Sequence, residues 1–169
     1  MAKAGDHASV KIWCGTRVLV ITAIAAFHRF QHCVAAYPLA ESALVESTSL
    51  AFFVALPTGQ VEAWGDPCCG GEIPHVVRTR LEASGVRSVA STSYAFFVVL
   101  ETGQVEAWGS SGGSIPSDVK TRIEAGGVKS VASTSYAFFV VLHNGKVEVW
   151  GDPCCGGSIP SAVKTRIEA

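Results

Sequence analysis

The feature that most constrains the fold is a fifteen-residue stretch that occurs three times. It reads AFFVALPTGQVEAWG at residues 51–65, AFFVVLETGQVEAWG at 95–109 and AFFVVLHNGKVEVWG at 137–151. The tryptophans near its end are 44 residues apart in the first pair of copies and 42 in the second, because one loop has ten residues in two copies and eight in the middle one. A period of about 40 residues is typical of propeller blades, with a strand-and-helix solenoid as the alternative.

The last copy shows the expected local structure most completely. Strands are predicted at Val128–Ser133, Tyr136–Leu142 and Lys146–Trp150, with a tight turn at His143–Gly145 between the last two. Apolar residues occupy both parities of Tyr136–Leu142, so both faces of that strand must be covered. A glycine-rich loop follows, and residues 159–169 are predicted to form a short helix with a proline near its start.

Three short antiparallel strands are not stable alone in water, so the repeat units are expected to stack through both faces of each hairpin. The sequence therefore predicts a mainly β fold with short helices, built of three to four propeller-like blades of three antiparallel strands each. The predicted divisions are a divergent N-terminal segment, 1–41, and a repeat domain, 42–169, with units 42–85, 86–127 and 128–169.

The run VKSVASTSYAFFVVL, followed by a Gly-x-Val turn and Trp-Gly, resembles the repeat of the regulator of chromosome condensation family. It also resembles the shorter, three-stranded blades of β-lactamase-inhibitor protein II, and similar repeats occur in uncharacterised repeat proteins of marine bacteria and algal protists. The resemblance covers residues 42–169 and implies a propeller fold. It implies no activity, since the superfamily includes exchange factors, inhibitors and scaffolds.

The number of blades leaves three outcomes open. Residues 10–14 and 17–21, VKIWC and RVLVI, have the strand–turn–strand pattern of a diverged fourth hairpin. That hairpin could close a small ring, two chains could join head to tail as a homo-oligomer, or the arc could stay open with its apolar ends covered by a partner. The divergence of the upstream copy favours an incomplete, open propeller.

The apolar stretch Val18–Ala36 has several readings. Its uncharged run, Val18–Phe27, is too short to span a bilayer. A targeting segment is one alternative, and a degenerate strand leading into a short helix is the favoured one. His28 and His32 are four residues apart on a possible helix, with Cys33 adjacent, but no third ligand is confirmed, so no metal site is predicted.

Composition excludes several function classes. The net charge of −1 offers no basic field for nucleic acid, and the glycine loops lack the Lys-Ser/Thr that completes a phosphate cradle. No nucleophile and base stand at catalytic spacing. The sequence therefore predicts a non-enzymatic protein with no cofactor and no small-molecule substrate.

Adjacent cysteines occur in two of the three loops, as Cys68-Cys69 and Cys154-Cys155, and the middle copy lacks them. Neighbouring cysteines do not readily chelate one tetrahedral ion, and the two pairs lie two repeats apart. We therefore interpret them as structural loop residues and predict no metal site.

Three residue types recur at fixed blade positions. The tryptophans Trp64, Trp108 and Trp150 are predicted to anchor neighbouring blades. The carboxylates Glu62, Glu106 and Glu148 are interpreted as solvated charges on an edge strand. The basic pairs of each helix segment, Arg78 and Arg80, Lys120 and Arg122, and Lys164 and Arg166, are interpreted as a solvated helix face.

Two function classes remain. The first is a protein-interaction or scaffold module, an accessory subunit of a larger assembly with a protein partner. An organellar membrane complex, and hence an organellar or membrane-peripheral location, follows only from where similar repeats occur. The second is a regulator of an enzyme, either a hydrolase inhibitor or a small-GTPase exchange factor, which rests on fold analogy alone.

Overall fold

The computed structural model describes residues 10–14, 17–21 and 43–169, and it divides the chain into two units, Met1–Pro38 and Leu39–Ala169. In the first unit, β1 (Val10–Cys14) and β2 (Arg17–Ile21) pair as an antiparallel hairpin. The short helix and the targeting segment considered above fall mainly on residues outside the described ones, as do His28, His32 and Cys33.

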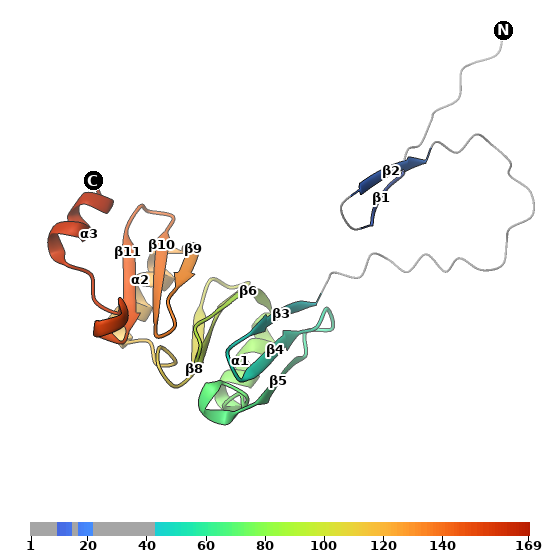
Figure 1. Ribbon diagram of the computed structural model, residues 1–169, viewed down its shortest axis with the longest axis horizontal. Coiled ribbons are helices and arrows are strands. Elements are labelled where there is room, and N and C mark those ends of the chain that lie inside the picture. The colour runs from blue at the N-terminus through green and yellow to red at the C-terminus, as the bar shows by residue number, and fades with distance from the viewer. Residues whose placement is uncertain (1–9, 15–16, 22–42) are drawn as a thin grey trace, which may run out of the picture. The chain divides into compact units, whose positions relative to one another are not determined.

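Each repeat in the second unit forms one three-stranded antiparallel sheet, and the sheets follow one another in chain order (Figure 1). Their strands are β3 (Leu44–Ser47), β4 (Ala51–Ala55) and β5 (Val61–Gly65), then β6 (Val86–Ser91), β7 (Ala95–Leu100) and β8 (Val105–Gly109), then β9 (Val128–Ser133), β10 (Ala137–Leu142) and β11 (Val147–Gly151). This confirms the prediction of a mainly β fold built of three-stranded, propeller-like blades. The three sheets do not close into a ring.

The register is the same in every sheet. Phe52 lies opposite Trp64, Phe96 opposite Trp108, and Phe138 opposite Trp150. The predicted strand boundaries agree with β9 to β11 to within one residue. Equivalent positions of the three sheets can therefore be compared directly.

A short helix follows each sheet: α1 (His75–Ser84), α2 (Ser117–Gly126) and α3 (Ser161–Ile167). Each begins directly after a proline, whose fixed φ suits a helix start. The first two end at Gly85 and Gly127, which have positive φ and whose N–H groups close the last helical turn. Two single turns of 3₁₀ helix, η1 (Pro67–Cys69) and η2 (Pro153–Cys155), occupy the ten-residue loops.

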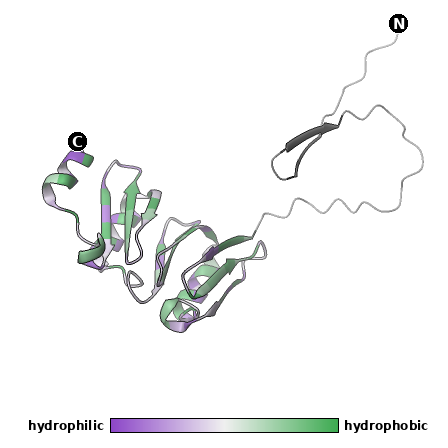
Figure 2. Cartoon of the chain, viewed as in Figure 1, coloured by the Kyte–Doolittle hydropathy of each residue, from purple (hydrophilic) through white to green (hydrophobic). Residues whose placement is uncertain are grey.

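The core lies between the sheets. All six residues of β7 are buried, because its two faces pack against different neighbours. Phe96, Val98 and Leu100 join Phe53 of the first sheet in one cluster, whereas Phe97 and Val99 join Phe138 of the third sheet in another. Apolar residues dominate the central strands (Figure 2). Burying one such side chain contributes about 1.5–3 kcal/mol, so stacking of neighbours stabilises sheets that could not persist alone.

The glycine that follows each tryptophan permits close packing within the sheet. Gly109 and Gly151 have φ of 111° and 123°, and a Cβ atom on either would lie 2.3 Å from the carbonyl oxygen of Tyr94 or Tyr136. A side chain would collide with that backbone. The Trp-Gly pair thus belongs to the geometry of the hairpin itself.

Candidate interaction surfaces

Two tryptophans join neighbouring sheets. Trp108 lies among aromatic rings from both sides, with its centroid 5.3 Å from Phe53 and 5.4 Å from Phe96. Its indole Nε1–H donates to the carbonyl oxygen of Gly70 in the preceding repeat at 2.9 Å, and Trp150 makes the same bond to Gly112 at 2.9 Å. Both indoles are buried. Each therefore combines apolar contact with a hydrogen bond across an inter-sheet boundary.

Trp64 occupies the equivalent position of the first sheet but not the equivalent environment. It is 52% exposed and stacks on Phe52 at 5.4 Å, and Phe52 is itself 49% exposed. Of the three predicted anchors, the structure thus places two between sheets and leaves the third on the surface.

The interpretation of the recurring carboxylates as solvated charges is wrong for two of the three. Glu106 and Glu148 are buried, with 7% and 4% of their surface exposed. They share a strand face with the following tryptophan, two residues on, and that face packs against the preceding repeat. Only Glu62, whose side chain is 62% exposed, fits the prediction.

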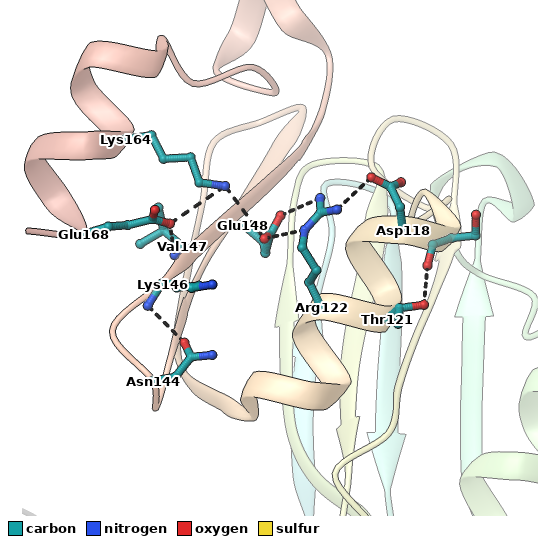
Figure 3. Close-up of polar contacts among 10 residues, drawn as sticks. Asp118, Thr121, Arg122, Asn144, Lys146, Val147, Glu148, Lys164 and Glu168 are labelled. Carbon is teal, nitrogen blue, oxygen red and sulfur yellow. Dashed lines mark hydrogen bonds and ion pairs between the residues drawn. The ribbon is translucent and has the colours of Figure 1, made fainter.

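Each buried carboxylate is held by two cations from two different helices. Glu106 contacts Arg80 of α1 at 2.7 Å and Lys120 of its own repeat at 3.0 Å. Glu148 accepts two hydrogen bonds from Arg122 of α2, at 2.7 and 3.0 Å, and lies 3.7 Å from Lys164 (Figure 3). The basic pairs are therefore not only a solvated helix face. In the first two pairs, the second cation reaches forward to the next repeat.

Arg122 is the centre of the better-formed contact. Besides Glu148, it donates to Asp118 one turn earlier in α2 at 2.9 Å (Figure 3). Hydrogen bonds to Glu148, and then to Asp118, raise the pKa of the Arg122 guanidinium, and the bond from Arg122 lowers the pKa of Asp118. The paired, charged forms are thus the favoured ones.

Serine and threonine residues join the sheets at one edge. Ser49 and Ser93 donate their backbone N–H groups to the carbonyl oxygens of Ser93 and Ser135 in the following repeat, both at 3.1 Å. In the opposite direction, the hydroxyls of Ser91 and Ser133 donate to the carbonyl oxygens of Ser47 and Ser91 at 2.7 and 2.6 Å. The Ser-Thr-Ser triplets therefore form a polar ladder from sheet to sheet. Beside it, the hydrogen bond with Tyr94 raises the pKa of Tyr136.

One surface of the first sheet is apolar and exposed. We call it the outer face; it consists of Val45, Leu50, Phe52, Leu56, Glu62 and Trp64. Its apolar members are five of the seven large apolar side chains that are exposed among the described residues. Their equivalents in the second sheet, Val89, Tyr94, Phe96, Leu100 and Trp108, pack against the first sheet. An exposed group of this kind marks an interaction surface.

The opposite end of the stack carries the matching surface. We call it the terminal face; it consists of Phe139, Val141, Ile159, Val163, Arg166 and Ile167. Ile167 is 47% exposed, whereas its equivalents Leu81 and Ile123 are fully buried under the next sheet. Phe139 is likewise only half-buried, while Phe53 and Phe97 are buried completely.

The loop cysteines lie in η1 and η2, where Asp66 and Asp152 accept hydrogen bonds from the N–H groups of Cys68 and Cys154 at 2.8 Å. Cys69 is buried in the core, and this burial raises the pKa of its thiol, with Asp66 and Cys68 raising it further. Cys68 and Cys154 are exposed, Cys155 is half-buried, and all four are free thiols. Within residues 43–169 and the two described N-terminal strands, no three potential metal ligands gather.

No described helix combines the length and the apolar character needed to cross a lipid bilayer.

Comparison with known proteins gives structural neighbours of low identity. No family model matches the chain, and no curated protein matches its sequence. Solved structures similar to it include yeast RCC1 (Prp20) bound to Kap60, with 13% identity and a TM-score of 0.48 over 90% of this chain and 39% of that one. Human WBSCR16 has 17% identity and a TM-score of 0.48, over 85% of this chain and 41% of that one.

The CRINKLY WD40 ectodomain of the Arabidopsis thaliana receptor kinase ACR4 is a third neighbour, with 14% identity and a TM-score of 0.42. It is matched over 63% of this chain and 35% of its own length. The chain thus spans between a third and about two fifths of the neighbours' lengths. Likeness at this level concerns the fold alone.

Proposed function

We propose that the chain is a non-enzymatic protein-interaction module, an accessory subunit of a larger protein assembly that binds through the outer face. The observation that carries this proposal is the exposure of Phe52 and Trp64, whose equivalents are buried in both following sheets. Apolar groups that the repeat elsewhere covers with another protein surface are most simply accounted for by a protein partner.

The charge pattern supports the same kind of partner. Glu62 stands at the edge of the apolar group, and its contact at 3.5 Å is with Arg78 of its own repeat. Glu106 and Glu148 hold a cation from the neighbouring repeat as well. A partner of complementary chemistry therefore presents an apolar patch with a cationic side chain at its rim.

The test is the state of the chain in its native extract. The wild-type chain is expected to elute from size-exclusion chromatography in an assembly larger than a single chain of 17.7 kDa. The double variant Phe52→Ser, Trp64→Ser is expected to elute apart from it. Val76→Ser is the matched control, because Val76 is 61% exposed but lies on α1, outside the outer face. Elution of the wild type as a free chain would overturn the proposal.

Regulation of an enzyme remains the alternative prediction. It would show as a change in the kinetics of a hydrolase, or in nucleotide exchange by a small GTPase, on addition of the purified chain. The interaction-module proposal expects no such change.

A further inference from the structure

We infer that the protein that covers the outer face is a second copy of this chain, which docks its terminal face there head to tail. This inference rests on the proposed function and names the partner of the same surface. Two such contacts related by a twofold axis would join two chains into one ring. Each element of the inter-sheet contacts has its counterpart on the outer face and the terminal face.

The ion pairs between repeats form a series, and its first carboxylate and its last cation have no partner from another repeat among the described residues. Arg80 reaches Glu106, and Arg122 reaches Glu148, in each case from a helix to the next sheet. The next cation in this series is Arg166 of α3, and the carboxylate at the start of the series is Glu62. Arg166 is exposed and makes no ion pair with any described residue. Arg166 of one chain is thus the complement of Glu62 of the other.

The indole hydrogen bonds extend in the same way. Trp108 and Trp150 donate to the carbonyl oxygens of Gly70 and Gly112, whose φ angles are 91° and 92°. Gly156 holds the equivalent place after η2 with a φ of 99°. The exposed Trp64 of a second chain therefore finds its acceptor at Gly156.

Each end of the polar ladder offers one hydrogen-bond donor and one acceptor to the next chain. In the pattern of Ser49 to Ser93 and Ser93 to Ser135, the N–H of Ser135 would donate to the carbonyl oxygen of Ser49 in the next chain. The hydroxyl of Ser47 would likewise donate to the carbonyl oxygen of Ser133, as Ser91 and Ser133 do within the chain. One contact differs: Leu50 takes the place of Tyr94, so Tyr136 would pack on an aliphatic side chain rather than on a second tyrosine.

Closure after two copies gives the smallest ring that a head-to-tail contact can form. A heterologous contact that closes in this way leaves neither apolar face open, which an extended filament would not achieve.

The experiment is the mass of the full chain by size-exclusion chromatography with light scattering over a range of concentrations. The wild type is expected at twice 17.7 kDa. Arg166→Glu and Glu62→Arg each place like charges across both contacts and are expected to weaken dimerisation by about tenfold to a hundredfold. The double variant Glu62→Arg, Arg166→Glu restores opposite charges in reversed order and is expected to dimerise again.

Lys146→Glu is the matched control, since Lys146 lies exposed in the β10–β11 turn and makes no ion pair with a described residue. It is expected to leave the dimer intact. The altered side chains are exposed, so an unchanged midpoint of thermal unfolding of the diluted variants will verify that they fold. Failure of the double variant to recover the dimer would overturn the assigned contact.

A wild-type chain that stays at 17.7 kDa at all concentrations would overturn the inference. If the variant Phe52→Ser, Trp64→Ser still leaves the native assembly in that case, the outer face binds a different protein and the proposed function stands. If that variant stays in the assembly, both proposals fail.

Discussion

The outer side of β4 and the equivalent side of β7 carry nearly the same sequence in opposite environments. Phe52 and Leu56 are exposed on the first sheet, whereas Phe96 and Leu100 are fully buried on the second. Among residues 43–169, a preceding sheet packs on the second sheet, whereas none packs on this side of the first. The burial of these side chains therefore depends on the neighbouring sheet and not on the strand itself. The first sheet keeps an exposed apolar face of the kind that packs against a neighbour elsewhere in the stack.

The burial of the recurring carboxylates also depends on the neighbouring repeat. Glu62 and Glu106 follow equivalent valines on equivalent strands, yet one side chain is 62% exposed and the other 9%. A buried carboxylate is tolerated only where cations and hydrogen bonds compensate for the loss of water. The preceding helix supplies that compensation for Glu106 through Arg80.

The largest expected difference between the two regions is that between Phe96→Ala and Phe52→Ala. Removing the buried ring should lower the free energy of unfolding by about 3–5 kcal/mol, because it leaves a cavity between sheets. Removing the half-exposed ring should cost about 1 kcal/mol or less. Urea unfolding of both variants in the Arg166→Glu chain, where dimerisation is suppressed, measures this. Equal losses would contradict the described burial.

A second comparison uses Glu148→Gln and Glu62→Gln. Loss of the buried carboxylate should cost about 1–3 kcal/mol, because Arg122 and Lys164 lose charge-assisted hydrogen bonds, although both cations still reach water. Loss of the exposed one should cost about 0–1 kcal/mol. Urea denaturation of the two variants measures this difference. A larger loss of stability for Glu62→Gln than for Glu148→Gln would contradict the buried, paired environment assigned to Glu148.

A third comparison concerns the indole hydrogen bonds. Trp150→Phe should cost about 1–2 kcal/mol, because the carbonyl group of Gly112 loses its buried donor. Trp64→Phe should have almost no effect in the monomeric background. Thermal unfolding of the two variants sharpens the comparison. The account would be in difficulty if Trp64→Phe were the more destabilising change.

The smallest effect is expected for Asp118, which gives α2 a contact that α3, with Ala162 at that place, cannot make. The bond from Arg122 lowers the pKa of Asp118 below its unfolded value of about 3.9. This pair therefore adds stability above that pH, and the contribution is lost as pH falls through the lowered, folded-state pKa. The difference in unfolding free energy between wild type and Asp118→Asn should be largest near pH 7 and should shrink as pH falls through the lowered, folded-state pKa. A difference that persists in acid would show that the charge is not its source.

Most of the fold could be predicted from the repeat. The two apolar parities of Tyr136–Leu142 require neighbours on both sides, and the Asn144-Gly145 turn fixes the hairpin that joins β10 to β11. Prolines and glycines mark the helix ends. These features depend on local sequence, and the structure confirms them.

The ends of the stack and the buried carboxylates could not be predicted in the same way. A glutamate between two apolar residues reads as solvated, because the cations that bury Glu106 and Glu148 come from other helices. The sequence does contain one relevant signal. Each repeat has one glutamate in its last strand and, in its helix, two cations that are two residues apart. The exposure of Trp64 had no local signal, since its surroundings in sequence match those of Trp108.

The most direct test of the central claim, that the outer face lies open until a copy of the repeat covers it, is acrylamide quenching of tryptophan fluorescence in the monomeric Arg166→Glu chain. We expect Trp64→Phe to remove a red-shifted, readily quenched component, and Trp108→Phe to remove a blue-shifted, protected one, with Trp13 and Trp150 present in both variants. If Trp64 is as well protected from acrylamide as Trp108 in that monomer, another part of the same chain covers the outer face, and the account is contradicted.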